Sequence, residues 1–165
     1  LDADLVRAGF ATATSPGRLE VVRRSPTVMV DAAHNPHGAQ ALARAITDSF
    51  DFTSLVGVVG VLADKDAAGV LAALEPCLDR VVLTEPSSPR ALPADDLAVL
   101  AEEVFGADRV FVEPDLPDAL DRATELAEES GEYGGSGVLV TGSVVLVGDA
   151  RRMLGRDAPS AGGTS

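Results

Sequence analysis

The stretch "TVMVDAAHNPHGAQAL", residues 27–42, contains the pattern that decides the fold. A run of β-branched and apolar residues ends at Asp31, and the apolar residues after Asn35 recur at helical spacing. Asn35 followed by Pro36 is a typical helix start, because the asparagine side chain accepts a first-turn N–H and proline lacks one. The stretch therefore predicts a strand over 27–31 that leads through a short loop into a helix.

The same alternation of a short apolar run and a helical stretch occurs along the whole chain. Runs this uniformly apolar, instead of alternating with polar residues, are typical of parallel strands covered on both faces. Strands that alternate with helices in this way predict a parallel, doubly wound sheet. The predicted strands of this kind span residues 27–31, 55–62, 80–84, 109–113 and 137–142.

One further strand is predicted ahead of this series. Residues 18–24, "RLEVVRR", are separated from the strand 27–31 only by Ser25 and Pro26, so the two should form an antiparallel hairpin. The predicted fold class is α/β, a Rossmann-like, doubly wound three-layer sandwich. Its mixed sheet should have about six strands, about five of them parallel and one antiparallel near the N-terminus.

The chain of 165 residues is long enough for one domain with its own core. We expect this domain to span residues 1–154 and the small, polar residues 155–165 to form a disordered tail. Residues 144–154 fit either a last strand or a terminal helix. Because the chain begins at Leu1 instead of methionine, we expect it to be part of a longer protein.

Composition and charge limit the function. The net charge of −13 argues against nucleic acid and anionic membranes as partners, since both attract clustered Lys and Arg. The single cysteine, Cys77, cannot form an internal disulfide, which suits a reducing compartment. No run of about 18 apolar residues is present. We expect a cytoplasmic protein.

The loop after the strand 27–31 is the first candidate site. Ligands of open α/β sheets bind beyond the carboxyl ends of the strands. There Asp31 could accept two hydrogen bonds from a ribose, and His34 could donate one to a phosphate or a carboxylate at the helix start. In the alternative interpretation, Asp31 accepts N–H groups of the loop, and His34 and His37 are solvated. A metal site of these three residues is disfavoured, because the positive end of a helix repels cations.

Three further positions could bind an anion, and two of them have a plain structural alternative. Arg18 follows a Pro-Gly turn and could pair with phosphate or stack on a base, or be a surface arginine. Ser143, after Gly142, could bond a carboxylate or cap a helix. Lys65 is one of few cations at this edge, beside a predicted helix cap, Asp66. No GxGxxG, GxxxxGK[ST] or GxSxG motif and no nucleophile–base pair accompanies them.

Three blocks of the sequence resemble, in this order, the C-terminal domain of folylpolyglutamate synthase and dihydrofolate synthase, members of the Mur ligase superfamily. The blocks are "PGRLEVVRRSPTVMVDAAHNPHGAQAL" (16–42), "GVLADKD" (60–66) and "TGSVVLVGDAR" (141–151). The first, with its PGR turn and D-x-A-H-N-P motif, is the specific one. The likeness covers nearly the whole chain up to about Arg152.

This resemblance implies an ATP-dependent, amide-forming ligase. In the family, an N-terminal ATPase domain carries a P-loop, Mg²⁺ ligands and a modified lysine, and the C-terminal domain closes over it. ATP phosphorylates a carboxylate of dihydropteroate or of a folate glutamyl tail, and the amine of L-glutamate attacks the acyl phosphate. The expected partners are ATP, L-glutamate, dihydropteroate or folate, and the chain's own N-terminal ATPase domain. The full-length protein should be a monomer, and this chain alone should be inactive.

The resemblance also implies roles for single residues. Arg18, Asp31 and Asn35 would bind ATP, with Asp31 on the ribose. His34 would lie near the phosphates or the incoming glutamate and is the candidate catalytic residue, while Ser143 would bind glutamate. Weaker candidates for substrate contact are Lys65 and Arg90, and no metal ligand is expected on this chain. Ser15 and Val145 stand where the family often has aromatic residues.

Two rival interpretations remain at the level of sequence. A Mur peptidoglycan ligase also has a PGR-like turn and a D-x-A-H motif, but the Asn-Pro that follows and the "TGS" block favour the folate branch. A free-standing receiver-like or flavodoxin-like module would need an acidic pair or a phosphate loop after its first strand, whereas here a single Asp31 precedes Ala32 and Ala33. The sequence leaves the choice between dihydropteroate and folate open.

Overall fold

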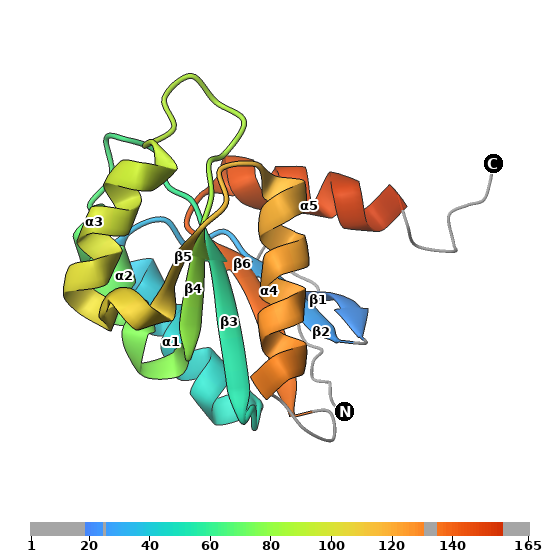
Figure 1. The fold of residues 1–165 in the computed structure, drawn as a ribbon. Coiled ribbons are helices and arrows are strands. Elements are labelled where there is room, and N and C mark those ends of the chain that lie inside the picture. Colours follow the sequence, from blue (N-terminus) through green and yellow to red (C-terminus); the bar gives the residue numbers. More distant parts are fainter. Residues whose placement is uncertain (1–18, 25, 131–134, 157–165) are drawn as a thin grey trace.

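The computed structural model describes residues 19–24, 26–130 and 135–156, in which strands and helices alternate (Figure 1). The strands are β1 (Glu20–Arg24), β2 (Thr27–Asp31), β3 (Ser54–Val59), β4 (Arg80–Leu83), β5 (Val110–Val112) and β6 (Ser136–Thr141). The helices are α1 (Pro36–Ser49), α2 (Ala67–Leu74), α3 (Ala94–Phe105), α4 (Leu116–Ser130) and α5 (Val144–Arg156), with short 3₁₀ helices η2 (Glu75–Cys77) and η3 (Ala107–Arg109).

The six strands form one mixed sheet in the order β1-β2-β6-β3-β4-β5. β1 pairs with β2 in antiparallel orientation, and the other neighbours are parallel. This confirms the predicted mixed sheet with five parallel strands and one antiparallel strand. β6, the last strand in the chain, lies between β2 and β3, so its end is next to the ends of both.

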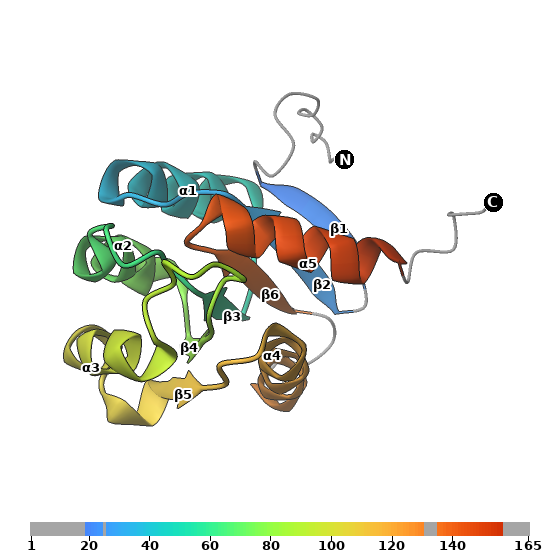
Figure 2. The same cartoon turned by 90° about the horizontal axis from the view of Figure 1, so that it is seen from above.

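Helices cover both faces of the sheet (Figure 2). α1, α2 and α3 pack on one face around Met29, Leu55 and Leu139. α4 and α5 pack on the other face around the neighbouring residues Val30 and Val138. Because successive strand residues point to opposite faces, an uninterrupted apolar run supplies both cores.

Local signals place the helix starts as predicted. The Asn35 side chain accepts the Gly38 N–H at 2.7 Å, and Pro36 follows as the first residue of α1. Asp66 caps α2 by accepting the Gly69 N–H at 2.9 Å. The open question about residues 144–154 is settled in favour of a helix, and α5 runs on to Arg156. Residues 157–165 of the predicted tail lie outside the described residues.

Several predicted strands are shorter in the structure, and the runs 55–62 and 109–113 show why. The run 55–62 leaves the sheet after Val59, and at Gly60 a Cβ atom would lie 2.8 Å from the Thr84 carbonyl oxygen. The run 109–113 forms only β5, whose residues are all half-buried. β5 still packs on both faces, with Val110 and Val112 against one core and Phe111 against the other, but its burial is only partial, because an edge strand has no neighbour on its open side.

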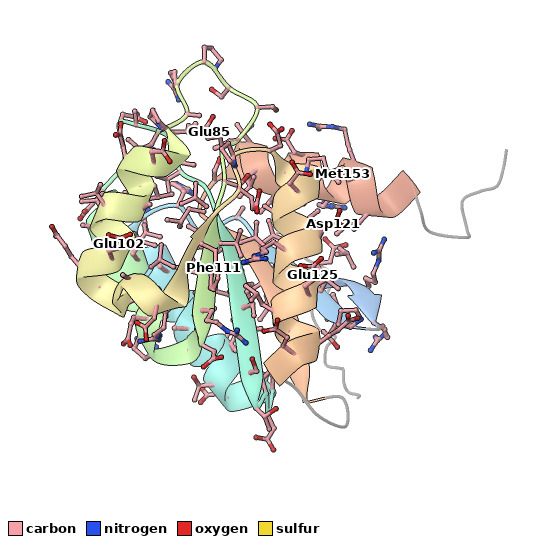
Figure 3. The ribbon with its side chains drawn as sticks, viewed as in Figure 1. Glu85, Glu102, Phe111, Asp121, Glu125 and Met153 are labelled. Atoms are coloured by element: carbon pink, nitrogen blue, oxygen red, sulfur yellow. The ribbon has the colours of Figure 1, made fainter. Side chains whose placement is uncertain are left out.

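The outer surfaces of α3 and α4 are acidic (Figure 3). Glu102 on α3 and Asp121 and Glu125 on α4 are exposed. Among the described helices, none is both long and apolar enough to cross a membrane.

Candidate ligand-binding site at the carboxyl edge of the sheet

The candidate site lies where β2, β6 and β3 end side by side. Asp31 pairs in register with Thr141, which in turn pairs with Val59. The Thr141 hydroxyl donates to the Asp31 carbonyl at 2.7 Å, and the Gly142 N–H donates to the Ala33 carbonyl at 3.0 Å. These bonds join the loop after β2 and the turn after β6 into one unit.

The Asp31 side chain stabilises this unit through hydrogen bonds to the backbone, and the residue is only 6% exposed. Its Oδ1 accepts the Ala33 N–H and its Oδ2 accepts the Leu19 N–H, each at 2.8 Å. The alternative interpretation of Asp31 as an acceptor of loop N–H groups is thus present in the structure. Its predicted contact with a ribose stays a prediction.

His34 and Asn35 follow in the same loop and differ in how they are engaged. The His34 Nδ1 lies 3.0 Å from the Ala32 carbonyl oxygen, and because a carbonyl only accepts, we assign the proton to Nδ1. This leaves Nε2 as the nitrogen that can meet a ligand. The Asn35 side-chain oxygen is occupied by capping α1.

A pocket of about 140 Å³ brings four of the sequence candidates together. They come from four segments: His34 from the loop after β2, Lys65 from the loop after β3, Arg90 from the loop after β4, and Ser143 from the turn after β6. The other lining residues are Leu62, Gly142, Val144 and Val145. The carboxyl ends of parallel strands are where a doubly wound sheet places a ligand.

The pocket favours an anion. Within the described part of the chain, neither the Lys65 ammonium nor the Arg90 guanidinium has a hydrogen bond or an ion pair. Val144 is the first residue of α5, so the positive end of that helix also contributes to the pocket. In a chain of net charge −13, two cations without an intramolecular partner are available for a negatively charged ligand.

Ser143 caps α5 and is 2% exposed. Its Oγ accepts the N–H groups of Val145 at 3.0 Å and Leu146 at 3.3 Å. The capping alternative is therefore present, and it leaves the hydroxyl proton for a second partner. The predicted contact between Ser143 and glutamate stays a prediction.

The remaining candidates do not line this pocket. Asp31 and Asn35 belong to the adjoining loop, and Arg18 lies outside the described residues. His37 is exposed on the first turn of α1, as expected for a solvated residue. The described residues contain no group of three or more His, Cys, Asp or Glu side chains that could hold a metal ion.

Sequence reasoning missed part of the pocket wall. Leu62 and Val144 line it, although neither carries a chemical signal of its own. Val144 is 62% exposed, which is unusual for a large apolar residue on a helix that packs against a sheet. Its place directly after the glycine and serine of the β6 turn was the only available signal.

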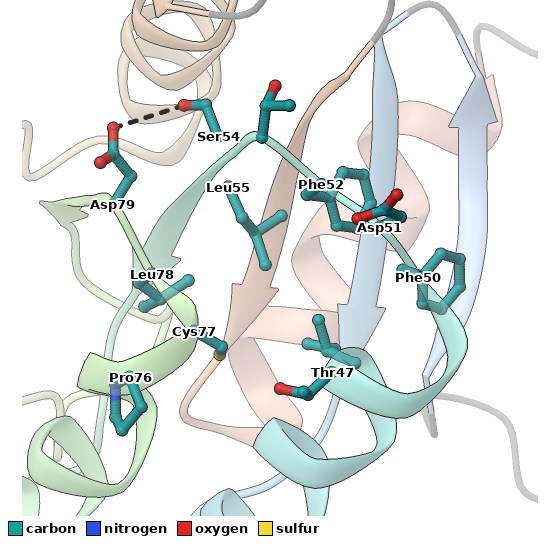
Figure 4. A pocket seen from close by; sticks show the side chains of 12 residues that line it. Thr47, Phe50, Asp51, Phe52, Ser54, Leu55, Pro76, Cys77, Leu78 and Asp79 are labelled. Atoms are coloured by element: carbon teal, nitrogen blue, oxygen red, sulfur yellow. Dashed lines mark hydrogen bonds between the residues drawn. The ribbon is translucent and has the colours of Figure 1, made fainter.

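A larger pocket, of about 410 Å³, lies at the opposite edge of the sheet and contains none of the candidates (Figure 4). It is formed by the end of α1, the start of β3 and η2, and a hydrogen bond of 3.4 Å between Ser54 and Asp79 crosses its rim. Burial raises the pKa of the Cys77 thiol in its wall to about 11. Cys77 therefore stays protonated at neutral pH and is a poor nucleophile.

Most of the chain, including the polar residues of the smaller pocket, matches one known protein family. Residues 17–144 match the family described as "Mur ligase, glutamate ligase domain". The chain belongs to this family. The matched range of this glutamate ligase domain includes all four polar residues of the smaller pocket and ends one residue into α5.

The glutamate ligase domain has close relatives among folate enzymes. It is 53% identical to the dihydrofolate synthase/folylpolyglutamate synthase of Mycobacterium tuberculosis. The aligned region covers 95% of this chain and 34% of that protein. A solved structure of M. tuberculosis folylpolyglutamate synthase complexed with ADP is 55% identical, with a TM-score of 0.85, over 95% of this chain and 36% of that one.

A more distant solved structure carries more ligands. It is a bifunctional folylpolyglutamate synthase/dihydrofolate synthase with Mn, AMPPNP and L-glutamate bound, 29% identical, with a TM-score of 0.73, over 91% of this chain and 34% of that one. The chain thus spans about a third of the length of the relatives it matches. Its sequence-level likeness to this branch of the Mur ligase superfamily is confirmed.

Proposed function

We propose that this chain is the glutamate-receiving domain of an ATP-dependent ligase that joins L-glutamate to dihydropteroate, to folate polyglutamates or to both. The observation that carries the proposal is the pocket with two unpaired cations, Lys65 and Arg90, beside His34 and the start of α5. L-Glutamate has two carboxylates and one amine. Two separate cations can hold both carboxylates and leave the amine free to react.

The proposed reaction has two steps. A carboxylate oxygen of the folate substrate attacks the γ-phosphorus of ATP, so ADP leaves and an acyl phosphate forms. The amine nitrogen of glutamate then attacks the acyl carbon, inorganic phosphate leaves, and the nitrogen loses its proton as the amide forms. The part of this chain is to orient the amine, and His34 Nε2 is the candidate for receiving the proton; once protonated, it can donate a hydrogen bond to the phosphate.

Nucleotide binding would involve the neighbouring loop. We assign Asp31 to the ribose and Arg18 to the nucleotide, with Asn35 supporting the loop through its cap on α1. The ADP and AMPPNP in the similar solved structures support a nucleotide site in the family. As the resemblance to the family implies, Mg²⁺ would be held by the N-terminal ATPase domain, where it would supply charge neutralisation for the phosphates.

The rival within the superfamily is a Mur peptidoglycan ligase. The named relatives, all folate enzymes, favour the folate assignment. The single Cys77 suits a cytoplasmic location, which we propose together with a monomeric full-length protein.

The direct test joins the chain to the remaining part of a full-length ligase. ADP release is then measured with and without L-glutamate, in the presence of dihydropteroate or tetrahydrofolate. We expect glutamate-dependent ADP release with at least one of them. If a folded protein releases no ADP with either acceptor but does so with a peptidoglycan precursor, the folate assignment is wrong and the chain belongs to a Mur peptidoglycan ligase.

A further inference from the structure

The loop between β4 and α3, residues 84–93, carries Arg90 and rises beside α5 at the carboxyl edge of the sheet (Figure 1). On one side it is tied to the loop after β3. The Ala63 N–H donates to the Arg90 carbonyl at 2.8 Å, and the Leu92 N–H donates to the Val61 carbonyl at 2.9 Å. The segment that carries Lys65 and the segment that carries Arg90 are therefore held together.

On its other side the loop is tied to α5 through one carboxylate. The Ser87 N–H donates to Asp149 Oδ2 at 3.0 Å, and the Ser87 hydroxyl donates to Asp149 Oδ1 at 2.7 Å. The Asp149 side chain is only 14% exposed and also accepts from Arg152. Two bonds from one residue to one carboxylate fix orientation as well as distance.

A short turn links this contact to Arg90. The Arg90 N–H donates to the Ser88 hydroxyl at 3.1 Å, and the Ala91 N–H donates to the Ser88 carbonyl at 3.1 Å. Ser87 precedes this turn directly. A displacement of Ser87 would therefore pass to the backbone of Arg90 instead of being absorbed by a flexible linker.

We propose that Ser87 and Asp149 form a latch that positions Arg90 for a carboxylate of the amino-acid substrate. This inference rests on the proposed function, because it concerns the same pocket. Neither latch residue lines the pocket, so both act through Arg90 and are positioning residues.

The latch has a physical reason. Arg90 is exposed and without a side-chain partner, so its long side chain is free before the ligand binds. Ordering such a side chain when the ligand binds costs conformational entropy. If the Arg90 backbone is already fixed, only the side chain has to be ordered, so this entropy cost is smaller. Because α5 also contributes Val144 and Val145 to the pocket, the latch joins the wall that carries Arg90 to the wall formed by the helix start.

The test uses the full-length ligase with Asp149→Ala, which removes both acceptors of Ser87. We expect the KM for L-glutamate to rise about tenfold, since two hydrogen bonds to a partly buried charge are lost. The KM for ATP should stay within about twofold, because the ribose loop is held by other bonds. Arg152→Ala is the matched control, because it removes only the other partner of Asp149, and it should leave the KM for glutamate within about twofold.

A double-mutant cycle separates positioning from general destabilisation. If Asp149 acts through Arg90, then Asp149→Ala adds nothing to the KM for glutamate in an Arg90→Ala background. A full additional tenfold rise in that background, or an unchanged KM after Asp149→Ala in a folded enzyme, overturns the latch. An unchanged KM after Arg90→Ala alone instead overturns the glutamate assignment of the pocket, and the latch with it.

Discussion

Gly142, in the turn after β6, has a φ of +114°, a backbone conformation that favours glycine. A Cβ atom at this position would lie 2.5 Å from the Gly60 carbonyl oxygen. We expect Gly142→Ala to lower the free energy of unfolding by about 3 kcal/mol, from backbone strain and the clash together. Denaturant unfolding measures the change.

Gly155 near the end of α5 provides the control, since a Cβ there would have no heavy atom within 4 Å. Gly155→Ala should raise stability by about 0.5 kcal/mol, because alanine loses less backbone entropy in a helix. If both substitutions change the free energy of unfolding equally, the approach of Gly142 to the Gly60 carbonyl oxygen does not constrain the turn.

Cys77 provides a pH-dependent prediction at the same scale. Burial raises its pKa to about 11, so the thiol stays protonated until the pH approaches that value. Alkylation by iodoacetamide should therefore be slow at pH 7 and accelerate only at strongly alkaline pH. The raised pKa also means that its contribution to stability is complete below about pH 9 and is lost as the pH rises towards 11. Modification at pH 7 as fast as that of an unfolded peptide thiol would contradict the assigned burial.

At the scale of the element, the start of α1 depends on one side chain. Asn35 accepts the Gly38 N–H, so Asn35→Ala should lower the free energy of unfolding by about 1 kcal/mol. Asn35→Asp keeps an acceptor at the same position and should stay within about 0.5 kcal/mol of the parent. Thermal unfolding of the two variants distinguishes the loss of the cap from a general effect of substitution at this loop.

The elements that could be predicted are those that depend on neighbouring residues. The strand at 27–31 and the caps Asn35 and Asp66 are local, and they appear in the structure as predicted. The place of β6 between β2 and β3 and the short edge strand β5 depend on pairing between distant segments. No local pattern contains that information.

The site was predictable to a similar extent. The sequence singled out His34, Lys65, Arg90 and Ser143 one by one, and the fold brings them to one pocket. The bond from Ser87 to Asp149 joins residues 62 positions apart, so neither residue stood out in the sequence. The sequence also could not decide between capping and ligand binding for Asp31 and Ser143, because one oxygen atom serves both uses.

At the scale of the whole molecule, the chain spans about a third of its relatives' length. The described residues hold no group of three or more metal-ligating side chains, and the sequence has no P-loop motif. We therefore expect the isolated chain to show no glutamate-dependent ADP release, and we expect the proposed full-length ligase to show it. A coupled assay for ADP checks this, and turnover by the isolated chain would mean that the phosphates are held on this domain.

The distribution of charge leads to the central claim. The surfaces of α3 and α4 are acidic, while the pocket at the carboxyl edge has two unpaired cations. The pocket lined by His34, Lys65 and Arg90 is therefore our proposed binding place for a small dicarboxylate.

The most direct test of this claim is the KM for L-glutamate of the full-length ligase with Lys65→Ala and with Arg90→Ala. We predict a rise of at least about tenfold for each, with the KM for ATP within about twofold, because each variant removes the proposed partner of one glutamate carboxylate. Arg24→Ala, on the exposed end of β1, is the control for loss of one positive charge and should leave the KM for glutamate unchanged. A KM for glutamate that is unaltered by both pocket substitutions, in folded and active enzyme, would contradict the account.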